Sequence, residues 1–127
     1  MNYNDINEKI KQITIEDYIW IIYIGIIVTS WYANKYESDY FNYNDMISKE
    51  KYRRMMIRIF TILVIIYFYF FKGSWNDLMS ISCSDSCKKK ELTYLSYVGS
   101  LFILFSGLIF LYIAYKDEQI DVEIAFN

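Results

Sequence analysis

Two cysteines, Cys83 and Cys87, are the side chains of this sequence best suited to covalent chemistry. In an oxidising compartment this C-x3-C pair would close a small disulfide ring, worth about 2 kcal/mol on the chain-entropy model. The alternative is a pair of free thiols. Two thiolates do not complete a structural zinc site, and the spacing differs from the C-x-x-C of redox motifs. We therefore predict a disulfide between the two residues.

The absence of histidine excludes most other site chemistry. None of the 127 residues is a histidine, so the chain has no catalytic triad, no Cys–His pair and no histidine-ligated metal. The 13 basic and 15 acidic side chains give a net charge of −2, which leaves no excess positive charge for nucleic acid. We expect a protein that is not an enzyme, with no catalytic residues, no cofactor, no metal and no nucleic-acid partner.

Long segments without charge predict the elements that carry these groups. Residues 18–34, 59–71 and 92–115 contain no charged side chain and are 17, 13 and 24 residues long. A helix needs about 20 largely apolar residues to cross a bilayer. The third segment suffices alone, and the first two suffice once their interfacial flanks are included. Arg58 then lies about one turn inside the membrane edge, where a long side chain can extend outward.

The predicted fold is all-α, a polytopic membrane protein with a bundle of three transmembrane helices in a single domain, residues 1–127. The expected spans are about 16–35, 55–72 and 92–115, followed by an acidic C-terminal tail at 117–127. Aromatic residues cluster at the ends of the charge-free segments, as is typical of membrane interfaces. A soluble helical bundle is the alternative, but the run 101–105 has no polar face.

Capping signals predict where the first two helices begin and end. An Asn-Asp pair at residues 4–5 can cap a first helix that ends near residue 35. Ser48 is a suitable N-cap for the second helix, and Lys72 followed by Gly73 is typical of a helix end.

The remaining limits follow from composition. The segment 35–47 is rich in Tyr, Asn and Asp, which predicts a polar loop between the first and second helices. The third helix is expected to start between Ser86 and Lys90 and to end near Lys116. After the second helix, residues 75–81 are expected to form either a short interfacial helix or an irregular loop.

Small side chains repeat along two of the predicted helices and are candidate helix-packing residues. They are Gly25, Thr29 and Ala33 on the first helix, and Ser96, Ser100, Gly107 and Ala114 on the third. Small residues let helices approach closely, and packing drives helix association in lipid. We expect them to pack the first helix against the third, or to mediate oligomerisation, and the two uses are compatible. The bulkier second helix is expected to face lipid or to fill the seam of the bundle.

Apolar and acidic residues alternate in the C-terminal tail. The apolar positions are Ile120, Val122, Ile124 and Phe126. This period of two is typical of an extended strand, which could add to the edge of a partner's sheet. The alternatives are a disordered acidic tail or docking against loop residues of the same chain. We predict the four residues as a partner-binding tail.

Orientation depends on the cysteines, because positive charge is nearly balanced between the two sides of the membrane. An oxidising environment for Cys83 and Cys87 places the N-terminus and the 72–91 loop outside. The 35–54 loop and the C-terminus are then cytoplasmic. The chain is expected to be integral to a membrane that the sequence does not specify.

The function that these features favour is association within a membrane. We expect a small non-enzymatic integral membrane protein that acts as a structural, scaffold or accessory subunit through helix packing. Its expected partners are the lipid bilayer and either further copies of itself or a larger membrane complex. The interior of the spans carries no Asp, Glu, Lys or Arg, since Arg58 is peripheral, and no proline interrupts them. This disfavours a transporter or ion channel that acts as a monomer.

Two other functions stay open. One is a holin-like or immunity-type membrane protein. The other is a thiol redox factor that uses Cys83 and Cys87, with Lys88 to Lys90 lowering the thiol pKa.

Overall fold

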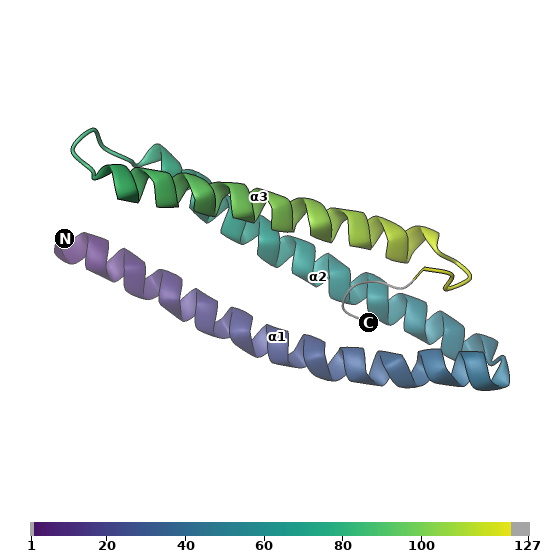
Figure 1. Ribbon diagram of the computed structural model, residues 1–127. Coiled ribbons are helices and arrows are strands. Elements are labelled where there is room, and N and C mark those ends of the chain that lie inside the picture. The colour runs from purple at the N-terminus through teal and green to yellow at the C-terminus, as the bar shows by residue number, and fades with distance from the viewer. Residues whose placement is uncertain (1, 123–127) are drawn as a thin grey trace.

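Three long helices make up the computed structural model, which describes residues 2–122. The helices are α1 (Tyr3–Tyr43), α2 (Met46–Met79) and α3 (Cys87–Lys116) (Figure 1). Each is long and apolar enough to cross a membrane, and residues 2–122 contain no strand. The predicted all-α, three-span architecture is confirmed.

The helices run up, down and up, with α2 in the middle. The start of α1 and the loop between α2 and α3 lie at one end of the molecule, and the tight α1–α2 turn and the end of α3 lie at the other (Figure 1). α2 packs against both neighbours, whereas no Cα atoms of α1 and α3 lie within 8 Å of each other in the described chain. The expected packing of the first helix against the third is therefore wrong, and the bulky second helix fills the seam between them.

The buried core belongs mainly to α2. It contributes five of the seven buried residues of the main cluster, namely Tyr52, Met56, Ile59, Phe60 and Leu63. Phe60 is only 1% exposed, and its ring packs against Phe110 of α3 with ring centroids 5.8 Å apart. The other two members, Ala33 of α1 and Ala114 of α3, are small and let both helices approach this side-chain bulk.

The junction of α1 and α2 is a two-residue turn instead of the expected polar loop. α1 continues to Tyr43 and ends at Asn44, which has a left-handed φ of 52° that asparagine tolerates well. Asp45 then caps α2, because its carboxylate accepts hydrogen bonds from the Ile47 N–H and the Ser48 hydroxyl. Ser48 is thus a residue of the first turn and not the cap.

Tertiary contacts explain why α1 and α2 both continue beyond their predicted ends. Beyond the membrane segment of α1, the rings of Tyr36 and Tyr40 each lie 5.3 Å from a lysine ammonium of α2. α2 passes through Lys72 and Gly73 to Met79, and its Trp75 packs against Tyr97 of α3 at 5.6 Å. Aromatic packing across the interface therefore outweighs the local stop signal.

Capping side chains set the start of α1 and the start of α3. The Asn2 side chain, and not residue 4 or 5, caps α1 by accepting the Asp5 N–H at 2.9 Å. Ser86 caps α3 by accepting the Lys89 N–H at 3.1 Å, and the helix ends at Lys116. The predicted start and end of the third helix are confirmed.

Candidate packing and docking surfaces

Gly107 is a position of close approach between α2 and α3. A Cβ atom at this position would lie 2.9 Å from Cδ2 of Tyr67 and 3.3 Å from Cγ2 of Val64. A larger side chain would therefore have to displace the tyrosine ring. Ala114, two turns further along α3, is also buried. These two small residues of α3 face α2.

A serine pair joins α2 and α3 nearer the other end. The hydroxyls of Ser74 and Ser100 are 2.8 Å apart. The Ser100 hydroxyl also donates to the Ser96 carbonyl at 2.9 Å, which leaves Ser74 as the donor across the interface. Ser96 itself is exposed. Ser100 thus contributes a hydrogen bond as well as small size.

Of the small residues of α1, Ala33 packs against α2 and Gly25 does not. Ala33 is fully buried against α2, whereas a Cβ at Gly25 would find nothing within 4 Å. The Thr29 hydroxyl donates to the Gly25 carbonyl within the same helix at 2.8 Å. The close approach of α1 to α2 is thus marked by Ala33, and Gly25 lies on an open surface.

An open groove lies over α2 where α1 and α3 fail to meet. Its volume is about 480 Å³, and its lining comes from all three helices, including Glu16, Trp20, Tyr23, Tyr67, Ser74 and Ser100. A neighbouring hollow of about 450 Å³ between α1 and α2 shares three of these residues and is more apolar. Sequence reasoning missed the groove, because Tyr67 and the serines come from different helices and carry no common period.

Two tyrosine hydroxyls in this groove lack protein partners. Within residues 2–122, neither the Tyr23 nor the Tyr67 phenol makes a hydrogen bond. Both residues lie on segments that would cross the hydrocarbon layer, where lipid tails offer no acceptor. The groove therefore holds two phenol groups that are not hydrogen-bonded within residues 2–122.

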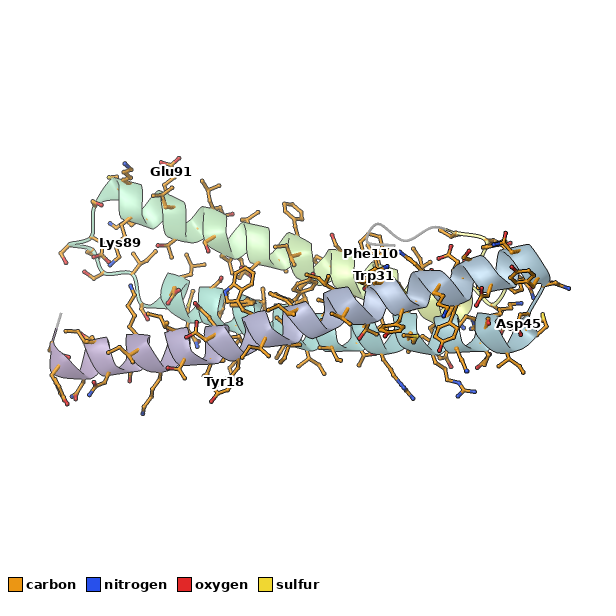
Figure 2. All side chains as sticks on the ribbon, turned by 90° about the horizontal axis from the view of Figure 1, so that it is seen from below. Tyr18, Trp31, Asp45, Lys89, Glu91 and Phe110 are labelled. Atoms are coloured by element: carbon orange, nitrogen blue, oxygen red, sulfur yellow. The ribbon has the colours of Figure 1, made fainter. Side chains whose placement is uncertain are left out.

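The outer surface of α1 is apolar and exposed in the part of the chain that the structure describes. Trp20, Ile24, Ile27 and Trp31 follow one another at helical spacing, and each is at least 62% exposed. Figure 2 shows Tyr18, also on α1, projecting away from the other helices. The surface that α1 offers to lipid or to a partner thus begins beside the groove at Trp20.

The described part of the C-terminal tail docks onto α2 and forms no strand. The Arg53 guanidinium donates to the carbonyls of Tyr115 and Asp117, both at 3.2 Å, and so caps the end of α3. The Lys49 ammonium donates to Oε1 of Gln119 at 2.8 Å. The described residues of the tail thus dock within the chain and do not form the extended strand that the alternation suggested.

Two of the four predicted tail residues can be placed. Ile120 has a left-handed φ of 56° and packs against the core cluster, while Val122 is half exposed beside it. Ile124 and Phe126 lie outside the described residues. The apolar half of the described tail is thus engaged within the chain, and a partner for the remainder stays a prediction.

The Asp117 carboxylate holds this turn in shape. It accepts the N–H of Asp121 at 3.0 Å and of Val122 at 2.7 Å. Burial acts to raise the pKa of the Asp117 carboxyl. The backbone hydrogen bonds and the nearby Arg53 charge outweigh burial and hold the pKa below its usual value. The ionised carboxylate is therefore the form that organises the tail.

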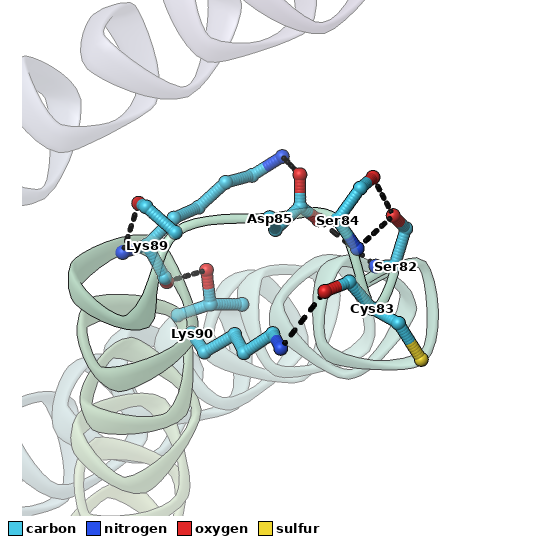
Figure 3. Close-up of polar contacts among 8 residues, drawn as sticks. Ser82, Cys83, Ser84, Asp85, Lys89 and Lys90 are labelled. Atoms are coloured by element: carbon cyan, nitrogen blue, oxygen red, sulfur yellow. Dashed lines mark hydrogen bonds and ion pairs between the residues drawn. The ribbon is translucent and has the colours of Figure 1, made fainter.

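The loop between α2 and α3 is organised by Asp85 and not by the cysteines (Figure 3). The Asp85 carboxylate accepts the Ser82 N–H at 2.9 Å and the Lys89 ammonium at 3.1 Å, and these two groups lower the pKa of its carboxyl. The Lys90 ammonium reaches the backbone carbonyl of Cys83, whose sulfur points outward in Figure 3.

Both cysteines are free and exposed, so the predicted disulfide is not formed in this structure. Among the described residues no group of three or more Cys, Asp or Glu side chains is placed to hold a metal ion. The loop thus presents two accessible thiols at one end of the molecule.

Comparison of the chain with protein-family models, with curated proteins and with solved structures finds no match.

Proposed function

We propose that this three-span membrane protein is a structural or accessory subunit that binds a transmembrane helix of a partner protein in the groove above α2. The observation that carries the proposal is the pair of unpartnered phenols of Tyr23 and Tyr67 on segments that would lie in the hydrocarbon layer. Interhelical hydrogen bonds and close packing are what hold helices together in lipid. A partner helix with a polar side chain would supply what acyl chains do not.

The shape of the bundle supports the same proposal. A closed three-helix bundle would cover its own polar side chains, but here α1 and α3 stay apart and leave the groove open. Trp20 lies on the groove wall and is 65% exposed, so that it can contact an incoming helix. Aromatic side chains of this kind dominate the energetics of many interfaces.

Purification from the native membrane in mild detergent, followed by mass spectrometry, tests the proposal. The wild-type chain should carry a second membrane protein, and a Y23F/Y67F variant should carry markedly less of it. A Y112F variant removes a phenol from an exposed position of α3 outside the groove and serves as the matched control. Recovery of the chain alone, or equal recovery of the partner with all three chains, would contradict the proposal. A complex made only of this chain would show that the partner is a second copy.

We further propose the orientation with the α2–α3 loop outside and the α1–α2 turn in the cytoplasm. The exposure of Cys83 and Cys87 makes this testable in intact cells with a membrane-impermeant thiol reagent, applied with and without reductant. Labelling before permeabilisation supports the orientation. Labelling only after permeabilisation would contradict it.

A further inference from the structure

Three cationic side chains lie on one exposed face of α2 near the start of its charge-free segment. Lys51, Arg54 and Arg58 follow at spacings of three and four residues, and all are exposed. This spacing places them on one side of the helix along about 10 Å of its axis. The same face continues with Ile65 and Phe68, which are 65% and 56% exposed. The cations therefore stand at one end of the surface that α2 presents to lipid.

The depth of Arg58 follows from its neighbours on α2. Phe60 packs against Phe110, which lies well inside the third charge-free segment. Arg53, further out on α2, donates to the Tyr115 carbonyl at the end of that segment. The backbone of Arg58 therefore lies within the apolar layer, and its guanidinium must extend toward the headgroups to stay solvated.

The protein itself compensates these positive charges only weakly. Arg54 pairs with Glu50 at 3.4 Å, but both side chains are more than half exposed, and such surface pairs contribute little. The Lys51 ammonium lies over the Tyr36 ring at 5.3 Å. Within residues 2–122, Arg58 makes no hydrogen bond or ion pair. The two arginines therefore offer free hydrogen-bond donors at the level of the headgroups.

The opposite end of the molecule is different. Figure 2 places Asp45, at the α1–α2 turn, and Lys89, at the α2–α3 loop, at opposite ends. At the loop end, the Lys89 and Lys90 ammonium groups donate to the Asp85 carboxylate and the Cys83 carbonyl. The other exposed cations at that end are lysines and not arginines, among them Lys9, Lys11 and Lys88. Uncommitted arginine donors on the lipid-facing surface of α2 are thus a feature of the α1–α2 end.

We propose that the face formed by Lys51, Arg54 and Arg58 binds the phosphate group of an anionic phospholipid. A guanidinium matches phosphate oxygens with two parallel hydrogen bonds, and cations beside a span attract anionic headgroups. The acyl chains of the bound lipid lie along Ile65 and Phe68. This site is independent of the groove between α1 and α3, and it ties one end of the bundle to the anionic lipid of one leaflet.

Lipid binding to the purified, delipidated full chain in mild detergent tests the proposal. Native mass spectrometry compares phosphatidylglycerol with phosphatidylcholine of the same acyl chains. Each cation near the surface changes the affinity for an anionic lipid about five-fold. An R54Q/R58Q variant should therefore bind phosphatidylglycerol about 25-fold more weakly, with phosphatidylcholine binding unchanged. The preference of the wild type should also fall with added salt.

Two further variants control for charge and for folding. K9Q/K11Q removes two exposed cations at the other end of the molecule and should keep the wild-type preference for phosphatidylglycerol. R54K/R58K keeps both charges but loses the paired guanidinium hydrogen bonds, so its preference should lie between those of the wild type and R54Q/R58Q. Equal binding of the two lipids by the wild type, or an equal loss in K9Q/K11Q, would overturn the proposal. Loss of the preference in R54K/R58K, with unchanged helix content, would overturn a site based on charge.

Discussion

α3 and α1 pack on α2 in different ways. The contact of α3 extends from the serine pair at Ser100 through Gly107 to Ala114, and it is closed by the docked tail. On α1, Ala33 is fully buried, yet a Cβ atom at Gly25 would have no neighbour within 4 Å. A small residue therefore gives close packing only where a large residue such as Tyr67 stands opposite. α1, which packs less closely on α2, is the helix that leaves the groove open.

The largest effect is expected at Phe60, which both interfaces share. Its ring contacts Phe110 of α3 and lines the hollow beside α1. Because the side chain is almost fully buried, Phe60→Ala should lower the free energy of unfolding by about 3–5 kcal/mol. Phe68→Ala, on the exposed face of the same helix, is the control and should change it far less. The free energy of unfolding is measured by equilibrium unfolding in micelles. Equal losses in the Phe60 and Phe68 variants would show that α2 is not the centre of the core.

The next largest effect on the free energy of unfolding is expected at Gly107, in contrast to Gly25. Gly107→Leu forces the Tyr67 ring to move and should lower the free energy of unfolding by about 1–3 kcal/mol. Gly25→Leu has open space and should stay within about 0.5 kcal/mol of the wild type. Thermal unfolding in the same detergent provides the comparison. A greater loss at Gly25 would reverse the assignment of tight and loose interfaces.

The hydrogen bond between Ser74 and Ser100 should contribute less to the free energy of unfolding. Ser74→Ala removes the donor to Ser100, and hydrogen bonds between transmembrane helices average about 0.6 kcal/mol. Ser106→Ala, at an exposed position of α3, should have no measurable effect. A double-mutant cycle with Ser100→Ala isolates the pair, and a coupling energy of zero would contradict the bond.

The smallest effect concerns acid and the docked tail. The pKa of the Asp117 carboxyl is lowered in the folded chain, so the carboxylate stabilises the turn at pH values above its unfolded pKa of about 3.9. That contribution is lost as the pH falls through the lower folded pKa. Hydrogen exchange at the Asp121 and Val122 amides should be constant from about pH 7 to 5, once corrected for intrinsic rates, and lose protection only in stronger acid. Asp117→Asn should abolish this dependence, and unchanged protection in strong acid would contradict it.

The parts of the fold that could be predicted are those with a local or periodic signal. Three charge-free segments predicted three spanning helices, and Ser86 and Lys116 correctly marked the limits of α3. Residues 35–43 and 72–79 were not predicted to continue the first and second helices, but contacts from other helices keep them helical. Composition alone carries no trace of those contacts.

The packing and docking surfaces could be predicted only in part, since the residues that meet there are far apart in the sequence. Small size marked Gly107 and Ala114 but did not reveal that α2 lies opposite them. The alternation in the tail suggested a strand, whereas Arg53, more than 60 residues earlier, turns the chain back onto α2. Long-range hydrogen bonds of this kind have no counterpart in periodicity or spacing.

Photo-crosslinking in the native membrane tests whether a partner helix occupies the groove. A photoreactive amino acid at Trp20, on the wall of the groove, is compared with one at Tyr112, at an exposed position outside it. A partner helix in the groove should give a discrete protein adduct from position 20 and only lipid adducts from position 112. Protein adducts from position 112 with none from position 20 would contradict a partner helix in the groove.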